Sequence, residues 1–238
     1  MSRWILRRTR TTPARRRVFC FPCAGAGASS FLRWGAYLPK DTEVIAIQLP
    51  GRENRLNESC ADSLSYVIQQ LVTELQPLLD MPYGFFGHSF GALLSVELTH
   101  ALGRACLPLP QKITVSGANP PHRRLNLNIH AMDDEALLIA IREWGGRELK
   151  DFGKEFAELA LSILRADIKL LQHHEYDLQN ISVPLLVLGG SSDVLVSIEA
   201  LHAWSMLATS CEIVILKGDH FFFEQHLPTT IGGVLRDW

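Results

Sequence analysis

The sequence lacks any apolar run long enough to cross a membrane. A membrane-spanning helix needs roughly 18 to 20 predominantly apolar residues in succession. The longest apolar runs of this 238-residue chain, such as Val183 to Leu188, have the length of a β-strand. We therefore expect a cytoplasmic protein with no membrane partner.

The sequence also lacks an even number of cysteines and any set of residues spaced to bind a metal. The chain has five cysteines: Cys20, Cys23, Cys60, Cys106 and Cys211. An odd number favours free thiols in a reducing cytosol over a disulfide framework. No cluster of histidine, cysteine and carboxylate residues has the spacing of a metal site. We expect neither a metal nor a cofactor.

Internal repeats and low-complexity linkers do not occur either. With 47% hydrophobic and 20% charged residues, the composition is typical of a globular protein. A chain of this length commonly folds as one α/β unit. We expect a single domain over residues 1–238, and a monomer.

Acidic residues are absent before Asp41, whereas seven arginines precede Val18. An arginine-rich start is compatible with an organelle transit peptide or a nucleic-acid-binding arm. This segment is short, has no long apolar block and runs into a strand pattern. We interpret it as a solvated arm that leads into the first central strand, and we expect no nucleic-acid partner.

The chain does contain six short runs rich in β-branched and aromatic residues. Most are near-continuously apolar, as are the strands of a parallel sheet that is covered on both faces. The runs are Arg17 to Phe21, Glu43 to Gln48, Tyr83 to His88, Lys112 to Ser116, Val183 to Leu188 and Glu212 to Leu216. Helical patterns lie between them, so the order predicts an α/β fold with a doubly wound sheet.

Three of these helical patterns are well defined. A helix capped by Asp62 carries an apolar stripe at helical spacing from Leu64 to Leu75. Two further patterns run from Ser89 to Leu102 and from Ile198 to Leu207. These helices supply the crossovers between parallel strands.

One interval is too long for a single crossover helix, because about 65 residues separate Ser116 from Val183. Its helical segments are Asp133 to Trp144, Phe152 to Leu164 and Ala166 to His173, with Gly145 and Gly146 as a hinge or cap. Insertions between the later strands of such a sheet lie at its ligand-binding edge. We favour a helical lid over about residues 122–180 above a decorative surface insertion.

The sharpest motif is G-x-S-x-G at Gly87 to Gly91. It follows a predicted strand and precedes a predicted helix, which is the context in which this motif places a nucleophilic serine on a strained turn. The glycines permit the turn, and the start of the helix favours developing negative charge. Ser89 is the candidate nucleophile.

An acid and a base follow Ser89 in the order that this chemistry requires. Asp193 follows the strand that ends at Leu188, and His220 follows the strand that ends at Leu216. We expect hydrogen bonds between Ser89 and His220 and between His220 and Asp193. The second would fix the tautomer of the imidazole. Among the rivals, Asp219 is expected to point elsewhere, and His88 to pack beside the serine turn.

Acyl transfer also needs donors for the oxyanion of the tetrahedral intermediate. The amide of Phe90 is the first candidate, and the amide of Ala24 in the glycine-rich loop after Phe21 is the second. A phosphate or dinucleotide cradle is the alternative for this loop, but it has neither the G-x-G-x-x-G pattern nor a following lysine. Cys23 has no predicted base beside it and is interpreted as a loop residue.

Taken together, these residues resemble the type II thioesterases that serve non-ribosomal peptide and polyketide synthases, a group with the α/β-hydrolase fold. The segments that carry the resemblance are Trp4, Phe19 to Gly25, Leu49 to Arg52, Gly87 to Gly91, Ser116 to Ala118, Leu164 to Asp167, Gly190 to Asp193 and Gly218 to Phe222. Two departures are Cys23, where the family usually has histidine or tyrosine, and Gly25-Ala26-Gly27, where it has paired glycines.

The resemblance implies hydrolysis of acyl or aminoacyl thioesters from the phosphopantetheine arm of acyl or peptidyl carrier protein domains, with a mobile lid after Pro121. The residues alone leave the ester class open, because the same triad cleaves oxygen esters. A free-standing carboxylesterase or lipase, and a catalytically silent docking partner of a synthase, are the alternatives. Large apolar residues of the lid, such as Leu137 or Phe156, are expected to influence the preference for acyl length.

Overall fold

A seven-stranded sheet forms the centre of the protein in the computed structural model, which describes residues 2–7, 13–123, 128–146 and 149–236. The strand order is β1-β3-β2-β4-β5-β6-β7. The strands are β1 (Ile5–Arg7), β2 (Arg16–Phe21), β3 (Thr42–Ile47), β4 (Tyr83–His88), β5 (Ile113–Ser116), β6 (Leu185–Gly190) and β7 (Cys211–Leu216). All neighbours pair in parallel except β1, which pairs antiparallel to β3.

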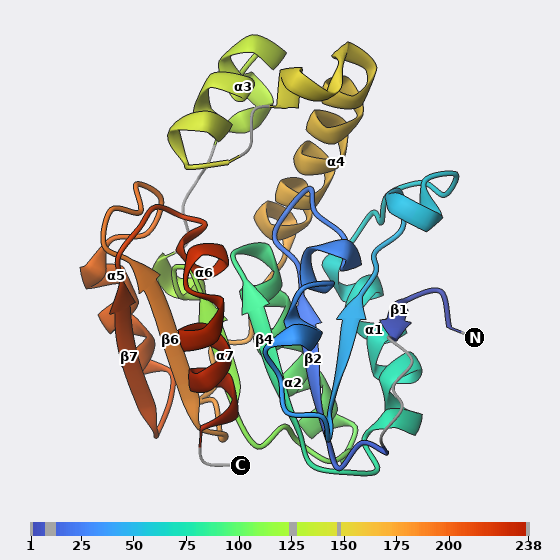
Figure 1. The fold of residues 1–238 in the computed structure, drawn as a ribbon, viewed down its shortest axis with the longest axis vertical. Helices are drawn as coiled ribbons and strands as arrows, with labels where there is room; N and C mark the ends of the chain where they lie inside the picture. Colours follow the sequence, from blue (N-terminus) through green and yellow to red (C-terminus); the bar gives the residue numbers. More distant parts are fainter. Residues whose placement is uncertain (1, 8–12, 124–127, 147–148, 237–238) are drawn as a thin grey trace.

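Helices cover both faces of this sheet (Figure 1). The α-helices of the described residues are α1 (Leu64–Leu75), α2 (Phe90–Arg104), α3 (Asp134–Glu143), α4 (Lys154–His173), α5 (Ile198–His202), α6 (Phe222–Gln225) and α7 (Leu227–Leu235). Alternate residues of each strand point to opposite faces. Phe19 and Phe85 therefore pack with α1 and α2, whereas Val18 and Phe86 pack with α7. The six strands predicted from the apolar runs are confirmed, with small shifts of their ends.

The first strand, β1, corrects the interpretation of the amino-terminal segment as a solvated arm. Its residues pair with β3, from Ile5 opposite Ile47 to Arg7 opposite Ile45. Arg7 donates to Glu43 at 2.8 and 3.0 Å. The run was too short and too charged to predict a strand, because the pairing depends on β3 rather than on the local pattern.

Two helix boundaries also differ from the sequence-based expectation. The N-cap of α1 is Ser63, whose hydroxyl accepts a hydrogen bond from the Tyr66 amide at 3.1 Å, and not Asp62. The helix predicted from Ile198 to Leu207 is α only as far as His202 and continues as a 3₁₀ turn, Ala203–Met206. Serine and aspartate are similar caps, so only the backbone direction distinguishes neighbouring candidates.

The insertion after β5 forms α3 and α4, which stand above the carboxyl ends of the strands (Figure 1). The two helical segments predicted at Phe152 to Leu164 and Ala166 to His173 are wrong as separate helices, because α4 continues through Arg165. A 3₁₀ turn, Leu149–Phe152, precedes it. Ile129, Leu137 and Leu161 form a small apolar core that joins α3 to α4.

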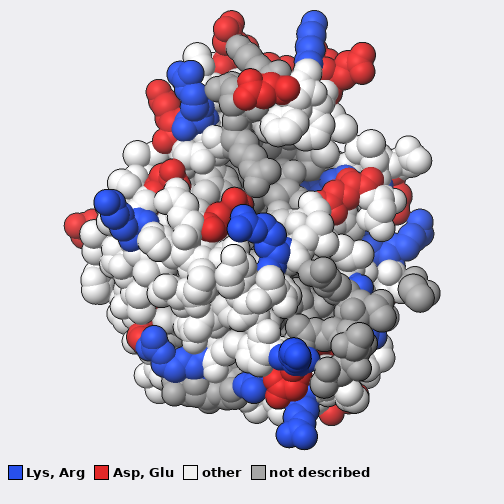
Figure 2. Space-filling view, viewed as in Figure 1, with Lys and Arg blue, Asp and Glu red and all other residues white. Residues whose placement is uncertain are grey.

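Charged side chains of both signs are interspersed on the face of the molecule shown in Figure 2. The residues described on this face therefore form no continuous basic surface of the kind that tracks a nucleic-acid backbone. Within the described part of the chain, no helix has both the length and the apolar character needed to cross a bilayer.

Candidate active site

Ser89 occupies a strained turn between β4 and α2. Its φ of 53° and ψ of −114° are unusual for a residue other than glycine, and they lift the side chain above the strand end. A Cβ at position 91 would lie 2.1 Å from the Phe21 carbonyl oxygen, so only glycine allows the neighbouring loop to pass this closely. The Ser89 amide donates to the Ser116 carbonyl at 2.8 Å, which ties the turn to the end of β5.

Asp193 and His220 come together from the loops that follow β6 and β7. The His220 Nδ1 atom lies 2.8 Å from the Asp193 Oδ2 atom. Both side chains are buried, with 5% and 0% of their surface exposed. The other carboxylate oxygen accepts hydrogen bonds from the amides of Leu195 and Val196 at 2.8 and 3.2 Å. These amides fix the carboxylate so that Oδ2 faces the imidazole.

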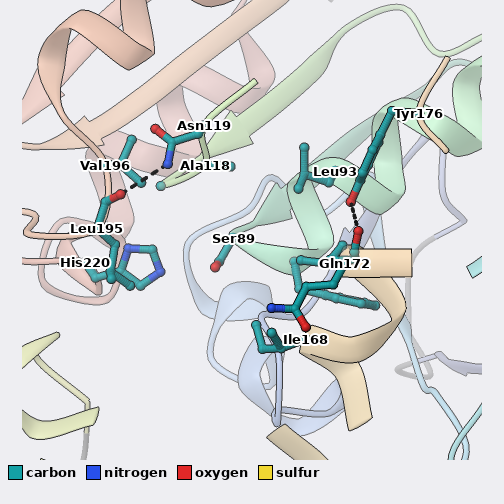
Figure 3. A pocket seen from close by; sticks show the side chains of 13 residues that line it. Ser89, Leu93, Ala118, Asn119, Ile168, Gln172, Tyr176, Leu195, Val196 and His220 are labelled. Carbon is teal, nitrogen blue, oxygen red and sulfur yellow. Dashed lines mark hydrogen bonds between the residues drawn. The ribbon is translucent and has the colours of Figure 1, made fainter. Parts of the chain in front are cut away.

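Ser89 and His220 face each other across a cavity (Figure 3). The expected hydrogen bond between them is not among those that the described residues make, although both line the same space. Catalytic hydrogen bonds are often long in a free enzyme and shorten when substrate is bound. The structure therefore brings the three predicted residues to one site and leaves the serine hydroxyl unbonded to the base.

The rival acid, Asp219, has a different position. Its Oδ1 atom accepts a hydrogen bond from the Phe221 amide at 2.9 Å. Its carboxylate also lies against the turn after α3, where a Cβ at Gly145 would be 2.2 Å from the Asp219 Cγ atom. Asp219 thus contacts the turn after α3, and among the described residues it makes no hydrogen bond to the His220 ring.

His88 lies behind the catalytic imidazole. The His88 and His220 ring centroids are 4.9 Å apart, and the His88 Nδ1 atom lies 3.0 Å from the Ser116 hydroxyl. Burial, together with the nearby charge of His220, holds the pKa of His88 well below its usual value. His88 is therefore a neutral packing residue beside the serine turn.

The glycine-rich loop after β2 approaches the start of α2, where both predicted oxyanion donors lie. The Phe21 and Pro22 carbonyl oxygens pack against Gly91. Neither the Ala24 nor the Phe90 amide donates to an acceptor among the hydrogen bonds of the described residues. A short 3₁₀ turn, Ala28–Phe31, follows the loop.

Cys23 stands in this loop, three residues after Cys20. Such a C-x-x-C spacing can mark a redox pair, but both residues are free thiols here. Burial, with smaller contributions from Glu224 and Asp167, raises the pKa of Cys23 to about 12. A thiol with this pKa carries almost no thiolate at neutral pH, so Cys23 is a poor nucleophile.

The cavity between Ser89 and His220 has a volume of about 340 Å³. Its walls are mostly apolar and come from α2, α4, the segment after α4, and the loops after β5 and β6: Leu93, Gly117, Ala118, Asn119, Ile168, Leu171, Gln172, Tyr176, Leu195 and Val196. Gly117 and Ala118 belong to the motif Ser116 to Ala118, whereas no motif marked the others as cavity residues. The helical spacing of Ile168, Leu171 and Gln172 was a signal for one shared face, but it could not show what that face contacts.

Leu137 and Phe156, which were expected to influence acyl preference, do not line this cavity. Leu137 is buried in the core between α3 and α4. Phe156 is 48% exposed and stacks on Phe152 with ring centroids 5.3 Å apart. The cavity is lined instead by Ile168 and Leu171, nearer the carboxyl end of α4.

The sheet order, the serine turn after β4, and the acid and histidine after β6 and β7 define an α/β-hydrolase with the geometry of a serine hydrolase. Such a site can attack a carbonyl, hold the resulting oxyanion and protonate a leaving group. Among the described residues, no group of three or more histidine, cysteine, aspartate or glutamate side chains is placed to bind a metal ion.

Comparison with known proteins gives the family. The family model of the thioesterase domain matches residues 16–237, so this chain belongs to the thioesterase family, whose members hydrolyse thioesters. The gramicidin S biosynthesis protein GrsT of Aneurinibacillus migulanus is 33% identical over 93% of this chain and 88% of its own length.

Solved structures of thioesterases share the fold. The RedJ thioesterase of the prodiginine pathway in Streptomyces coelicolor is 30% identical, with a TM-score of 0.88 over 96% of this chain and 95% of its own. YbtT, a type II thioesterase of the yersiniabactin NRPS/PKS pathway, is 26% identical, with a TM-score of 0.85 over 98% and 97% of the two chains. The resemblance seen in the sequence motifs is thereby confirmed.

Proposed function

We propose that this protein is an editing thioesterase that removes acyl or aminoacyl groups from phosphopantetheinyl carrier proteins of a non-ribosomal peptide or polyketide assembly line. The observation that carries the proposal is that Ser89 and the Asp193–His220 pair open onto one largely apolar cavity. Its membership of the thioesterase family, and similar proteins from gramicidin S biosynthesis and the yersiniabactin NRPS/PKS pathway, support the substrate class.

In the proposed mechanism, Ser89 Oγ attacks the thioester carbonyl while His220 Nε2 takes its proton. Asp193 holds the imidazole by Nδ1 and stabilises the imidazolium. The carbonyl electron pair moves to oxygen, which accepts hydrogen bonds from the Ala24 and Phe90 amides. The carbon–sulfur bond then breaks, and His220 returns the proton to the sulfur.

Hydrolysis of the acyl-serine repeats these steps with water as the nucleophile. A thiol with a pKa of about 8.5 leaves with less help from a proton donor than an alcohol does. All steps use the chain's own groups and water, so the proposal requires no cofactor.

We further propose that the enzyme acts as a monomer in the cytoplasm, and that residues 122–180 form a lid on a single domain.

The cavity has a size suited to a modest acyl group. Its volume of about 340 Å³ lies near the lower end of the range for small-molecule sites, roughly 300 to 1,000 Å³. Apolar walls from Leu93, Leu171 and Val196 would contact an acyl chain, whereas Asn119 and Gln172 add polar groups. The pantetheine arm would enter through the open side of the cavity.

The test is hydrolysis of short-acyl phosphopantetheinyl carrier protein, followed by the mass of the intact carrier. Wild type is expected to remove the acyl group, seen as loss of its mass from the carrier. Ser89→Ala should lower the rate of hydrolysis by at least about 10³-fold, because the members of a triad act as a unit. Circular dichroism and thermal unfolding of Ser89→Ala should match wild type, since alanine needs no new space.

Two outcomes would contradict the proposal. Cleavage of simple alkyl or aryl esters with no action on the acyl carrier would identify a general esterase. Failure of Ser89 to react with a fluorophosphonate probe, with no hydrolysis of either substrate, would identify a docking partner that lacks activity.

A further inference from the structure

A buried ion pair links the lid helix α4 to the loop after β3. Two Arg52 nitrogens donate to the two oxygens of Asp167 at 2.5 and 2.7 Å. The side chains are only 4% and 1% exposed. Both lie in sequence motifs that the proposed chemistry does not use, Leu49 to Arg52 and Leu164 to Asp167. A buried pair of this kind is weak evidence for stability, since desolvation offsets the attraction.

Both members of the pair also bind the loop that carries the proposed oxyanion donor. Asp167 Oδ2 accepts a hydrogen bond from the Gly25 amide at 2.8 Å. Arg52 Nη1 donates to the Ala26 carbonyl at 3.1 Å. Two hydrogen bonds therefore hold the loop, one at the Gly25 amide and one at the Ala26 carbonyl, immediately after Ala24. No other described side chain makes a recorded hydrogen bond to Ala24, Gly25 or Ala26.

The backbone of this loop needs such support. Gly25 has φ of +79°, in the left-handed region that glycine adopts readily but does not prefer over other conformations. A Cβ there would lie 3.4 Å from the Leu164 Cβ atom, so α4 also packs against this residue. The hydrogen bond from the Gly25 amide to the Asp167 carboxylate holds the peptide between Ala24 and Gly25 at this flexible residue.

We propose that Asp167, held by Arg52, is a positioning residue that aims the Ala24 amide at the oxyanion and ties the oxyanion loop to the acyl cavity. This inference rests on the proposed function, in which Ala24 is an oxyanion donor. Ile168, the next residue of α4, lines the cavity. One turn of α4 thus contacts both the acyl site and the loop that stabilises the transition state.

The decisive variant is Asp167→Asn, assayed on acyl carrier protein. An amide keeps the shape of the side chain but loses the charge that fixes it to Arg52. We expect kcat to fall by about 10-fold to 100-fold with KM within about twofold of wild type, because misplacement of one donor affects mainly the transition state. Arg52→Lys, which retains a cation but not the paired donors, should give a smaller loss.

Inhibitors separate an oxyanion effect from a general change of the cavity. An alkyl trifluoromethyl ketone adds Ser89 Oγ at its carbonyl carbon, its oxygen becomes the oxyanion, and the serine proton goes to His220. The corresponding alkyl methyl ketone occupies the same cavity largely without addition. Asp167→Asn should weaken inhibition by the trifluoromethyl ketone in proportion to kcat and leave inhibition by the methyl ketone unchanged.

Glu43→Gln is the matched control. It removes a buried carboxylate that pairs with Arg17 at 2.9 Å near the amino ends of β2 and β3, far from the strand ends that carry the site. It should lower stability without changing kcat or the inhibitor ratio. If Asp167→Asn does not fold, the double variant Arg52→Gln/Asp167→Asn replaces the charges by a neutral pair and is judged by the same criteria.

An unchanged kcat and trifluoromethyl ketone affinity in a folded Asp167 variant would overturn the inference. So would an equal loss of affinity for both ketones, which would indicate collapse of the cavity. These results differ from failure of the proposed function, in which wild type itself does not hydrolyse acyl carrier protein or Ser89→Ala remains active.

Discussion

At the scale of single residues, the environment of His88 has a consequence beyond packing. Its Nε2 atom is buried with no hydrogen-bond partner among the described residues, and its ring lies 4.4 Å from the Phe223 ring. A second proton would give this ring a positive charge, which would be buried beside His220 without a carboxylate to balance it. The folded protein therefore holds His88 neutral, and this neutrality has a measurable dependence on pH.

We predict that His88 makes the protein less stable as the pH falls from 6.5 to 5.5. Its pKa is lowered in the folded state and near 6.5 in the unfolded chain. Above pH 6.5 neither state is protonated, whereas below it only the unfolded chain binds the proton, so the free energy of unfolding falls. The slope from this one group reaches about 1.4 kcal/mol per pH unit.

Urea unfolding of wild type and His88→Gln at several pH values measures this slope. The variant should lose less stability than wild type across this range, even if it is less stable at pH 7. His202→Gln, which changes an exposed histidine, serves as the control and should keep the wild-type slope. If the free energy of unfolding falls with pH equally in wild type and His88→Gln, another group controls the loss of stability in acid.

At the scale of elements, the two halves of α4 make different contacts. Its carboxyl-terminal half contributes Ile168, Leu171 and Gln172 to the cavity, whereas its amino-terminal half packs on α3 through Leu161. The cavity-lining residues of α4 therefore lie closer to its carboxyl end than Phe156, which was first suggested by the size of its side chain.

We predict that Leu171→Ala shifts the preference toward longer acyl chains. Removing part of a cavity wall makes room for further methylene groups, each of which is worth about 1 to 3 kcal/mol in a fitted apolar pocket. The ratio of kcat/KM for octanoyl over butyryl carrier protein should rise by about tenfold. Competition assays with the two carriers, read by mass, give this ratio directly.

Phe156→Ala is the control, because it trims a large side chain of the same helix outside the cavity. Its ratio of kcat/KM for octanoyl over butyryl carrier protein should equal that of wild type. A shift in Phe156→Ala but not in Leu171→Ala would place the acyl chain between the lid helices instead of beside α2.

At the scale of the whole molecule, the amino-terminal segment closes one edge of the sheet. Trp4 is buried and lies 4.4 Å beneath the Arg55 guanidinium, and its carbonyl accepts a hydrogen bond from the Gln48 amide at 2.8 Å. Arg7 and Arg17 share Glu43. These arginines are thus paired with acids of the same domain.

We predict that deleting residues 1–10 lowers the melting temperature by about 5 to 10 °C, since burial of a large aromatic side chain is worth roughly 2 to 3 kcal/mol. KM for acyl carrier protein and its salt dependence should stay at the wild-type values. Trp4→Ala should reproduce most of the thermal loss, and Arg3→Gln, which breaks only an exposed pair with Glu58, very little. A raised, salt-sensitive KM after the deletion would instead assign the segment to carrier binding.

The sequence by itself determined the features that depend on local spacing. Runs of apolar residues predicted β2 to β7, and G-x-S-x-G between a strand and a helix predicted the turn at Ser89. Asp193 and His220 could be assigned because the carboxyl ends of parallel strands meet at one edge of the sheet. Each of these signals extends over fewer than about ten residues.

Only the tertiary structure decided the rest, because the partners are distant in the chain. β1 exists through its pairing with β3, and Asp167 meets Arg52 and Gly25 across more than a hundred residues. The cavity likewise combines side chains of α2, α4 and two loops. No local pattern specifies which long-range contacts form, since they are selected by the packing of whole elements against one another.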